Sequence, residues 1–242
     1  MGFFSRLFRS NTPAASSIAP STVSQDSAIV STPNTELSAA QAALALDDFS
    51  AALAHAEAVL DAEDKALRSD ALQIALTAAR ELGQWQRVYD YSQKGFEQAP
   101  TVFHALQLAL AAIQLQDLRR GEAWMEKAVE INLRRKDISP MLLRVRFVDA
   151  LCQQQLFSQA LPHLDWMKSL YLPFHHTDPA TLGLRGWPSF ADFLAQSWPV
   201  VSAALVPSQV QVWYASMLPY VDAAGQSAIR ELLVARCSGI AV

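Results

Sequence analysis

The chain has 242 residues, 51% of them apolar, with 8 glycines and a formal net charge of −4, which allows one large domain or one and a half with a sizeable core. Acidic and basic residues are mixed without a basic stripe, which argues against nucleic acid as a partner, and two distant cysteines favour a reducing compartment over a disulfide framework. No apolar run approaches the roughly 18–20 residues of a membrane span, so we expect a cytoplasmic protein.

Residues 1–9, MGFFSRLFR, form a compact apolar and basic segment. Four apolar side chains share one helical face and two arginines lie off it, so the residues predicted to dock are Phe3, Phe4, Leu7, Phe8, Arg6 and Arg9. Such a segment suits a weak, reversible anchor at the inner membrane face or a helix for a partner's groove, with a frayed tail as the alternative. Residues 10–35 are polar and aperiodic, which predicts a disordered linker.

Residues 36–173 repeat a pattern of two helices joined by a short turn. The turns align on Phe49, Trp85, Leu118 and Phe157, at spacings of 36, 33 and 39 residues. Three, seven and ten places later the chain carries mostly small or apolar residues, which predicts a buried stripe on the second helix of each pair. The stripe positions are Ala52, Val88, Gly121, Ala160, Ala56, Ser92, Met125, Leu164, Val59, Gly95, Ala128 and Met167. An irregular bundle of amphipathic helices would explain the helical period but not the recurring turn.

The turn Gly83-Gln84-Trp85, followed by Pro100 after the second helix, resembles the tetratricopeptide repeat. The resemblance implies an all-α, right-handed solenoid of about four helix pairs, whose concave face binds a peptide or a helix of a partner protein. Pro162 falls inside the fourth second helix, where we expect it to be tolerated only in the first turn.

The first helix of each pair is predicted to line the concave face. The candidate partner-binding residues are Gln73, Thr77, Arg80, Gln107, Gln114, Arg146, Asp149 and Gln153. Members of the family that hold acidic chaperone tails use a cationic clamp on these helices. The matching positions here are Leu37, Gln41, Ile74, Phe103 and Gln107, none of them cationic, so that ligand class is not expected.

Residues 174–242 are predicted to cap the repeats with three or four helices separated by prolines, after a loop over 173–188. Aromatic residues are concentrated here: Trp187, Phe190, Phe193, Trp198, Trp213 and Tyr214. Their helical spacing favours a buried cap that closes the apolar stack. The alternative is an aromatic surface for self-association, which would make the protein a structural subunit of a larger assembly.

The chain offers little that could carry chemistry. His175 and His176 lack further ligands at an informative spacing, so no metal is expected. Cys152 lies in an apolar helix, and no glycine-rich phosphate loop is present. We therefore expect a non-enzymatic adaptor or scaffold without a cofactor, with an enzyme using the 174–188 loop as a distant alternative.

Overall fold

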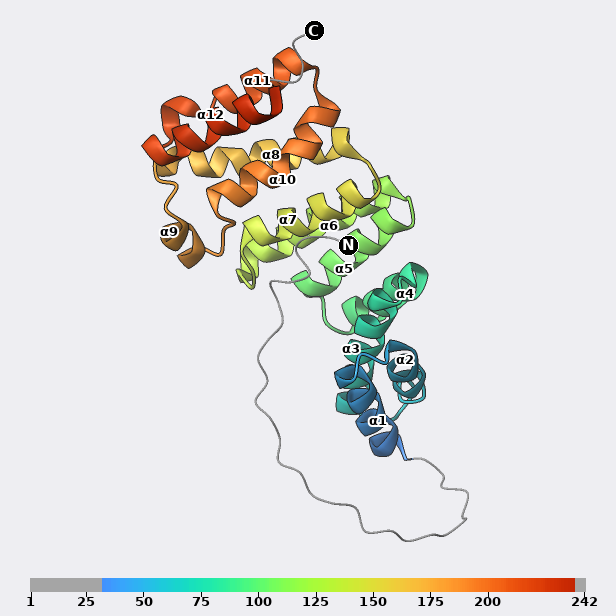
Figure 1. Ribbon diagram of the computed structural model, residues 1–242. Coiled ribbons are helices and arrows are strands. Elements are labelled where there is room, and N and C mark those ends of the chain that lie inside the picture. The colour runs from blue at the N-terminus through green and yellow to red at the C-terminus, as the bar shows by residue number, and fades with distance from the viewer. Residues whose placement is uncertain (1–31, 238–242) are drawn as a thin grey trace. The chain divides into compact units, whose positions relative to one another are not determined.

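The computed structural model describes residues 32–237, and the predicted docking segment 1–9 lies outside them (Figure 1). Within that range the regular structure is helical throughout, with twelve α-helices and no strand. The chain divides after Gly83 into two compact units. The first contains α1 (Pro33–Ala45), α2 (Phe49–Glu57) and α3 (Lys65–Glu81). The second contains α4 (Trp85–Gln98), α5 (Val102–Gln114), α6 (Leu118–Arg135), α7 (Pro140–Gln153), α8 (Phe157–Tyr171), α9 (Pro179–Leu184), α10 (Phe190–Ala204), α11 (Pro207–Ala215) and α12 (Ala223–Cys237).

The turn within each helix pair has the same backbone geometry in all four copies. A residue with positive φ lies two places before the second helix: Asp47 (58°), Gly83 (69°), Gln116 (62°) and Gln155 (58°). Each second helix, α2, α4, α6 and α8, begins at the aromatic or leucine residue used to align the copies. The repeat predicted from sequence is therefore also a repeat of backbone conformation, although three of the four left-handed residues are not glycine.

The stripe predicted on the second helices is confirmed, because all twelve of its positions are buried. The two glycines among them mark close approaches within the second unit. A Cβ atom on Gly95 would lie 2.6 Å from Nε2 of His104, and one on Gly121 would lie 2.5 Å from Cδ1 of Ile113. At Gly95, α4 closely approaches α5 of the next pair, and at Gly121, α6 closely approaches α5 of its own pair, which explains the small residues.

Two prolines that the sequence suggested as obstacles lie inside continuous helices. Pro162 falls in the second turn of α8, so the expectation that it needs the first turn is wrong. Pro199 lies inside α10, which is one helix where two were predicted. Each proline leaves one carbonyl without its helical donor, on Ser158 and Ala195, and both of these residues are exposed, so water can supply the missing hydrogen bond.

Two further boundaries differ from the prediction. Helix α1 begins at Pro33, inside the predicted linker 10–35, because Thr32 caps it and proline suits a first helical position. The predicted loop over 173–188 contains α9, whose N-terminus is capped by Asp178, which accepts from the backbone N–H of Thr181 at 2.8 Å.

The aromatic residues of the C-terminal region form a core. Phe190, Phe193, Trp213 and Tyr214 are all buried. Trp198 stacks on Tyr214 at a centroid distance of 5.6 Å. These four buried rings close the packing of α8, α10 and α11, whereas Trp187 and Trp198 are half-buried, so the self-association alternative stays a prediction.

Candidate functional site

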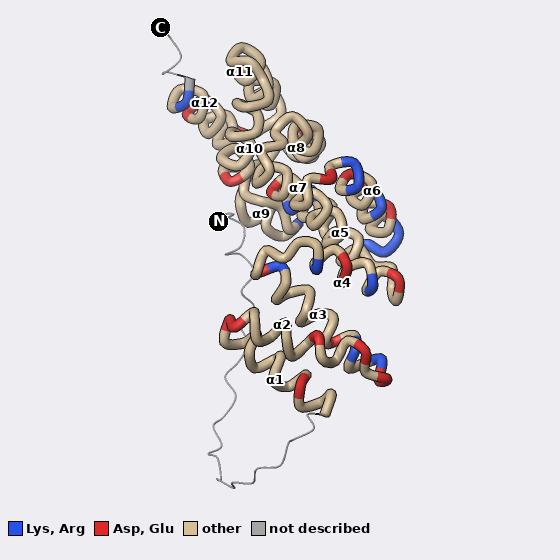
Figure 2. The backbone as a smooth tube through the Cα atoms, turned by 90° about the vertical axis from the view of Figure 1, so that its right-hand side faces the viewer, with Lys and Arg blue, Asp and Glu red and all other residues tan. Residues whose placement is uncertain are grey.

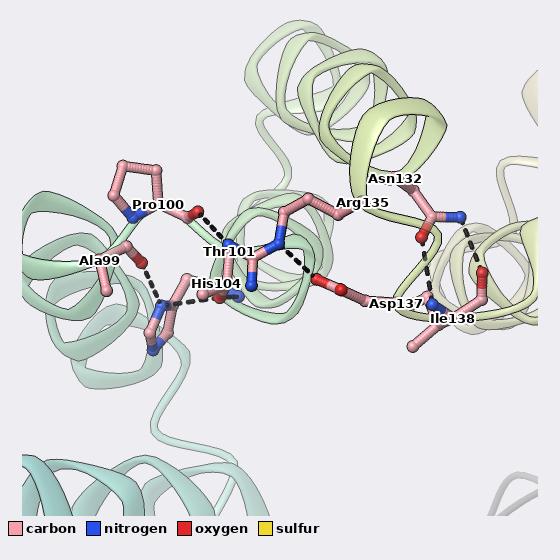
Figure 3. A network of polar contacts seen from close by, with 8 residues as sticks. All are labelled: Ala99, Pro100, Thr101, His104, Asn132, Arg135, Asp137 and Ile138. Atoms are coloured by element: carbon pink, nitrogen blue, oxygen red, sulfur yellow. Dashed lines mark hydrogen bonds and ion pairs between the residues drawn. The ribbon is translucent and has the colours of Figure 1, made fainter.

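Helices α5 and α7 are fastened to each other at their N-terminal ends by the loops that precede them (Figure 3). Arg135, at the end of α6, donates from Nη1 to the carbonyl of Pro100 at 3.4 Å, and its Nε lies 2.8 Å from Oδ2 of Asp137. The buried Asn132 holds the second loop by donating to the carbonyl of Ile138 (2.8 Å) and accepting from its N–H (3.1 Å). The loops before α5 and α7 therefore lie side by side.

The C-terminal ends of the same two helices are joined by a chain of amides. Gln114 on α5 donates from Nε2 to Oε1 of Gln153 on α7 at 2.6 Å. Gln154 donates from Nε2 to Oε1 of Gln114 at 2.8 Å. Because both pairs of ends meet, α5 and α7 run parallel, and the contact between Gln114 and Gln153 sets an offset of 39 residues between them.

This offset aligns two rows of side chains along one face, which we call the α5/α7 face. The row on α5 is Phe103, Gln107, Leu110 and Gln114, and the row on α7 is Leu142, Arg146, Asp149 and Gln153. Within each row the spacing is four, three and four residues, which keeps the side chains on one side of a helix. The five partner-binding residues predicted on these helices all belong to the two rows.

Two acceptors on this face lack hydrogen-bond donors. Gln107 is 6% exposed, and within the described residues its Oε1 has no hydrogen-bond partner. The Asp149 carboxylate is also without a hydrogen bond in that part of the chain, and its burial raises the pKa from 3.8 to about 7, against the smaller lowering effect of Arg146. Of the two, only Gln107 Oε1 is fully buried, and a buried acceptor without a donor suits a ligand that supplies one.

The three other predicted residues lie on α3 in the first unit. Thr77 stands six residues before its left-handed turn residue, as Asp149 does before Gln155. Counted back from the left-handed turn residue in the same way, Gln107 and Gln114 correspond to positions 74 and 81. Gln73 and Arg80 each lie one residue before these positions. Arg80 is paired with its neighbour Glu81 at 3.0 Å.

A second polar cluster joins α6, α7 and α8, and sequence reasoning missed it. Arg144 donates from Nη1 to Nδ1 of His163 at 2.8 Å, while Nε2 of His163 lies 3.7 Å from Oε2 of Glu122. The Arg144 guanidinium lies 4.2 Å from the ring centre of Trp166. Burial, followed by the charge of Arg144, lowers the His163 pKa to about 4, so this histidine is a neutral packing element at pH 7. No motif marks these residues, because they come from three helices.

An open groove of about 470 Å³ lies between α8 and α11. Its apolar walls include Leu161, Leu205 and Val212. Three of its polar side chains contact one another, since Trp213 donates to Asp165 at 2.6 Å and Lys168 lies 4.3 Å from the Trp213 ring centre. Among the described residues, none of the groove's side chains has a buried polar atom without a hydrogen bond, unlike Gln107 on the α5/α7 face.

The other residues considered for chemistry are one half-buried cysteine and two exposed histidines. Burial raises the pKa of Cys152 to about 11, with a smaller contribution from Asp149, so the thiol is not an activated nucleophile at neutral pH. His175 and His176 are exposed. Within residues 32–237, no group of three or more His, Cys, Asp or Glu side chains is placed to hold a metal ion.

Charged side chains of both signs occur along the described residues. Acidic and basic positions alternate on α6 (Figure 2), where Lys127 and Arg134 both pair with Glu130. In the same part of the chain, the helices are too short or too polar to cross a membrane.

No protein-family model matches the chain, and neither a curated protein nor a solved structure shows significant similarity to it.

Proposed function

We propose that this protein is a non-enzymatic, cytoplasmic adaptor built as a right-handed, tetratricopeptide-like solenoid, and that its α5/α7 face binds a segment of a partner protein. Four helix pairs with the same left-handed turn support the repeat architecture. In such architectures the first helices of successive pairs line a shared surface, and α5 and α7 are two of these first helices.

The observation that carries the proposal is the buried Gln107 Oε1, which has no hydrogen-bond partner among the described residues, on a face that also holds the half-buried Asp149 carboxylate. A buried polar group without a partner lowers the stability of the folded state by about 1–3 kcal/mol. An apolar residue would be more stable at that position, so the polar residue is expected to serve a purpose other than stability. Binding is the purpose that fits, because a partner segment can supply the missing donors.

A pull-down from the native source tests the proposal with two changes that should preserve the fold. Gln107→Leu removes the buried acceptor, and Asp149→Asn removes the half-buried carboxylate on the same face. We expect both variants to lose partner recovery by tenfold or more while melting cooperatively. Arg119→Glu, exposed on α6, is the matched control and should retain recovery. Full recovery with both variants would exclude the α5/α7 face as the binding surface.

A further inference from the structure

We propose that the α5/α7 face receives a basic side chain, an arginine or a lysine of the partner segment, with Gln107 and Asp149 as its acceptors. This inference rests on the proposed function and names the chemistry of the ligand. Cationic clamps in tetratricopeptide domains select acidic tails, whereas the site proposed here would select a basic side chain. The residues at the clamp positions of this chain are uncharged, which is compatible with that preference.

The geometry of the two acceptors favours a ligand with several donors. With the 39-residue offset, Gln107 stands level with Arg146, and Asp149 lies three residues further along α7, about 4.5 Å along the helix axis. A guanidinium carries five N–H donors in a planar fork and an ammonium carries three, so either can serve both acceptors at once. A single backbone N–H can satisfy only one of them.

The electrostatics of Asp149 also favour a cation over a neutral or acidic group. The Asp149 side chain is half-buried and receives no hydrogen bond from the described residues, and burial raises its pKa to about 7, so its charged form is poorly stabilised. An incoming cation would stabilise that form by direct pairing, whereas an acidic group would oppose it. Cation binding and deprotonation of Asp149 should therefore favour each other.

The charged groups on α7 allow this linkage to be attributed to Asp149. Arg146 is the charged neighbour that lowers the Asp149 pKa. Cys152, three residues further along α7, has its own pKa raised by the Asp149 carboxylate. Because Arg146 repels an incoming cation, Arg146→Gln should strengthen cation binding several-fold.

The titratable groups on the neighbouring helices are engaged elsewhere. On α5, His104 is the titratable side chain, and its Nδ1 is directed to Thr101 and to the carbonyl of Ala99. On α8, His163 is held by its contact with Arg144. On α6, Glu122 lies 3.7 Å from His163 and burial also raises its pKa, so a pH dependence of cation binding is assigned to Asp149 if Asp149→Asn removes it and Glu122→Gln does not.

Nuclear magnetic resonance titration of the full chain tests this directly, with N-acetyl-arginine amide and N-acetyl-citrulline amide as probes. The two have nearly the same shape, but only the first is charged. We expect the arginine probe to shift signals of α5 and α7, with affinity about tenfold higher at pH 8 than at pH 6, because Asp149 is mostly ionised only at the higher pH. Asp149→Asn should remove both the binding and its pH dependence. Equal binding of the citrulline probe, or no response of these helices to either N-acetyl-arginine amide or N-acetyl-lysine amide, would overturn the inference.

The outcomes separate this inference from the proposed function. If the basic probes fail but Gln107→Leu still abolishes partner recovery, the face binds a partner of other chemistry and the inference is wrong. If the arginine probe binds as expected while partner recovery survives every change on the face, the cation site stands and the adaptor surface must be sought elsewhere.

Discussion

Replacing Asp149 by asparagine should make the protein more stable at alkaline pH and leave it unchanged at acidic pH. The substitution keeps the shape of the side chain and removes its charge. In the folded chain, burial raises the Asp149 pKa from 3.8 to about 7. Because the folded-state pKa lies above the unfolded one, the unfolded chain releases this proton first as pH rises, which favours unfolding.

The magnitude follows from the size of the shift. A shift of about three pKa units corresponds to roughly 4 kcal/mol, and partial exposure of the group to solvent reduces the expected effect to about 1–3 kcal/mol. The loss of stability in the wild type should develop between pH 4 and pH 7 and then level off. Below pH 4 both folded and unfolded chains carry a protonated Asp149, so wild type and variant should coincide.

Urea unfolding at pH 4.5, 6 and 8, followed by far-ultraviolet circular dichroism, measures the difference between the two proteins. Subtracting one free energy of unfolding from the other removes the contributions of the remaining titratable groups. Glu97→Gln, an exposed carboxylate of the same unit, is the control and should change stability by less than about 0.5 kcal/mol at every pH. A difference that does not grow with pH, or that favours the wild type at pH 8, would refute the assignment of an unsatisfied, desolvated carboxyl to this face.

Three other changes have definite expected outcomes. Gly121→Val should lower the free energy of unfolding by about 1–3 kcal/mol, because its side chain would meet the buried Ile113, whereas Gly183→Ala, with open space around it, should be neutral or slightly stabilising in the same urea assay. Asn132→Ala should cost about 2 kcal/mol by leaving two backbone groups of the α6–α7 loop unpaired, and Asn132→Asp, which buries a charge and sets an acceptor against the Ile138 carbonyl, should cost at least as much near neutral pH. Deletion of residues 1–9 should abolish sedimentation with anionic vesicles if that segment is a membrane anchor, and should abolish partner recovery without affecting vesicles if it is a docking helix; loss of neither would identify it as a tail.

The helix pairs could be predicted because the turn and the stripe each leave a local mark in the sequence. An aromatic or leucine at the start of the second helix and small residues three, seven and ten places later are visible without knowledge of the fold. The left-handed turn residue was not visible, since Asp47, Gln116 and Gln155 occupy a conformation for which only Gly83 is the expected residue type. Tertiary packing of the paired helices holds these three residues in a backbone region that their side chains disfavour.

The proline positions show where local rules fail. Proline predicts a helix end because it removes a hydrogen bond and crowds the preceding turn. In α8 and α10 the freed carbonyls belong to exposed residues, and the opposite helix faces are buried against the aromatic core. Packing on one side of the helix and solvation on the other outweigh a local penalty of a few kcal/mol, and neither can be read from the sequence near the proline.

The candidate site could be predicted from the sequence only in part. The predicted lining on α5 and α7 came from assigning first helices to the inner face, and the structure places all five residues on the two aligned rows. The repeat spacing of 39 residues between Leu118 and Phe157 already gave the offset between these helices, and two distant contacts hold it, Arg135 with Pro100 at one end and Gln114 with Gln153 at the other. What sequence could not supply was the burial of Gln107 and Asp149, because burial depends on how several helices pack around them. The two contacts hold the rows in register, so Gln114→Leu, which breaks the amide chain, should weaken ligand binding at Asp149 without touching either acceptor.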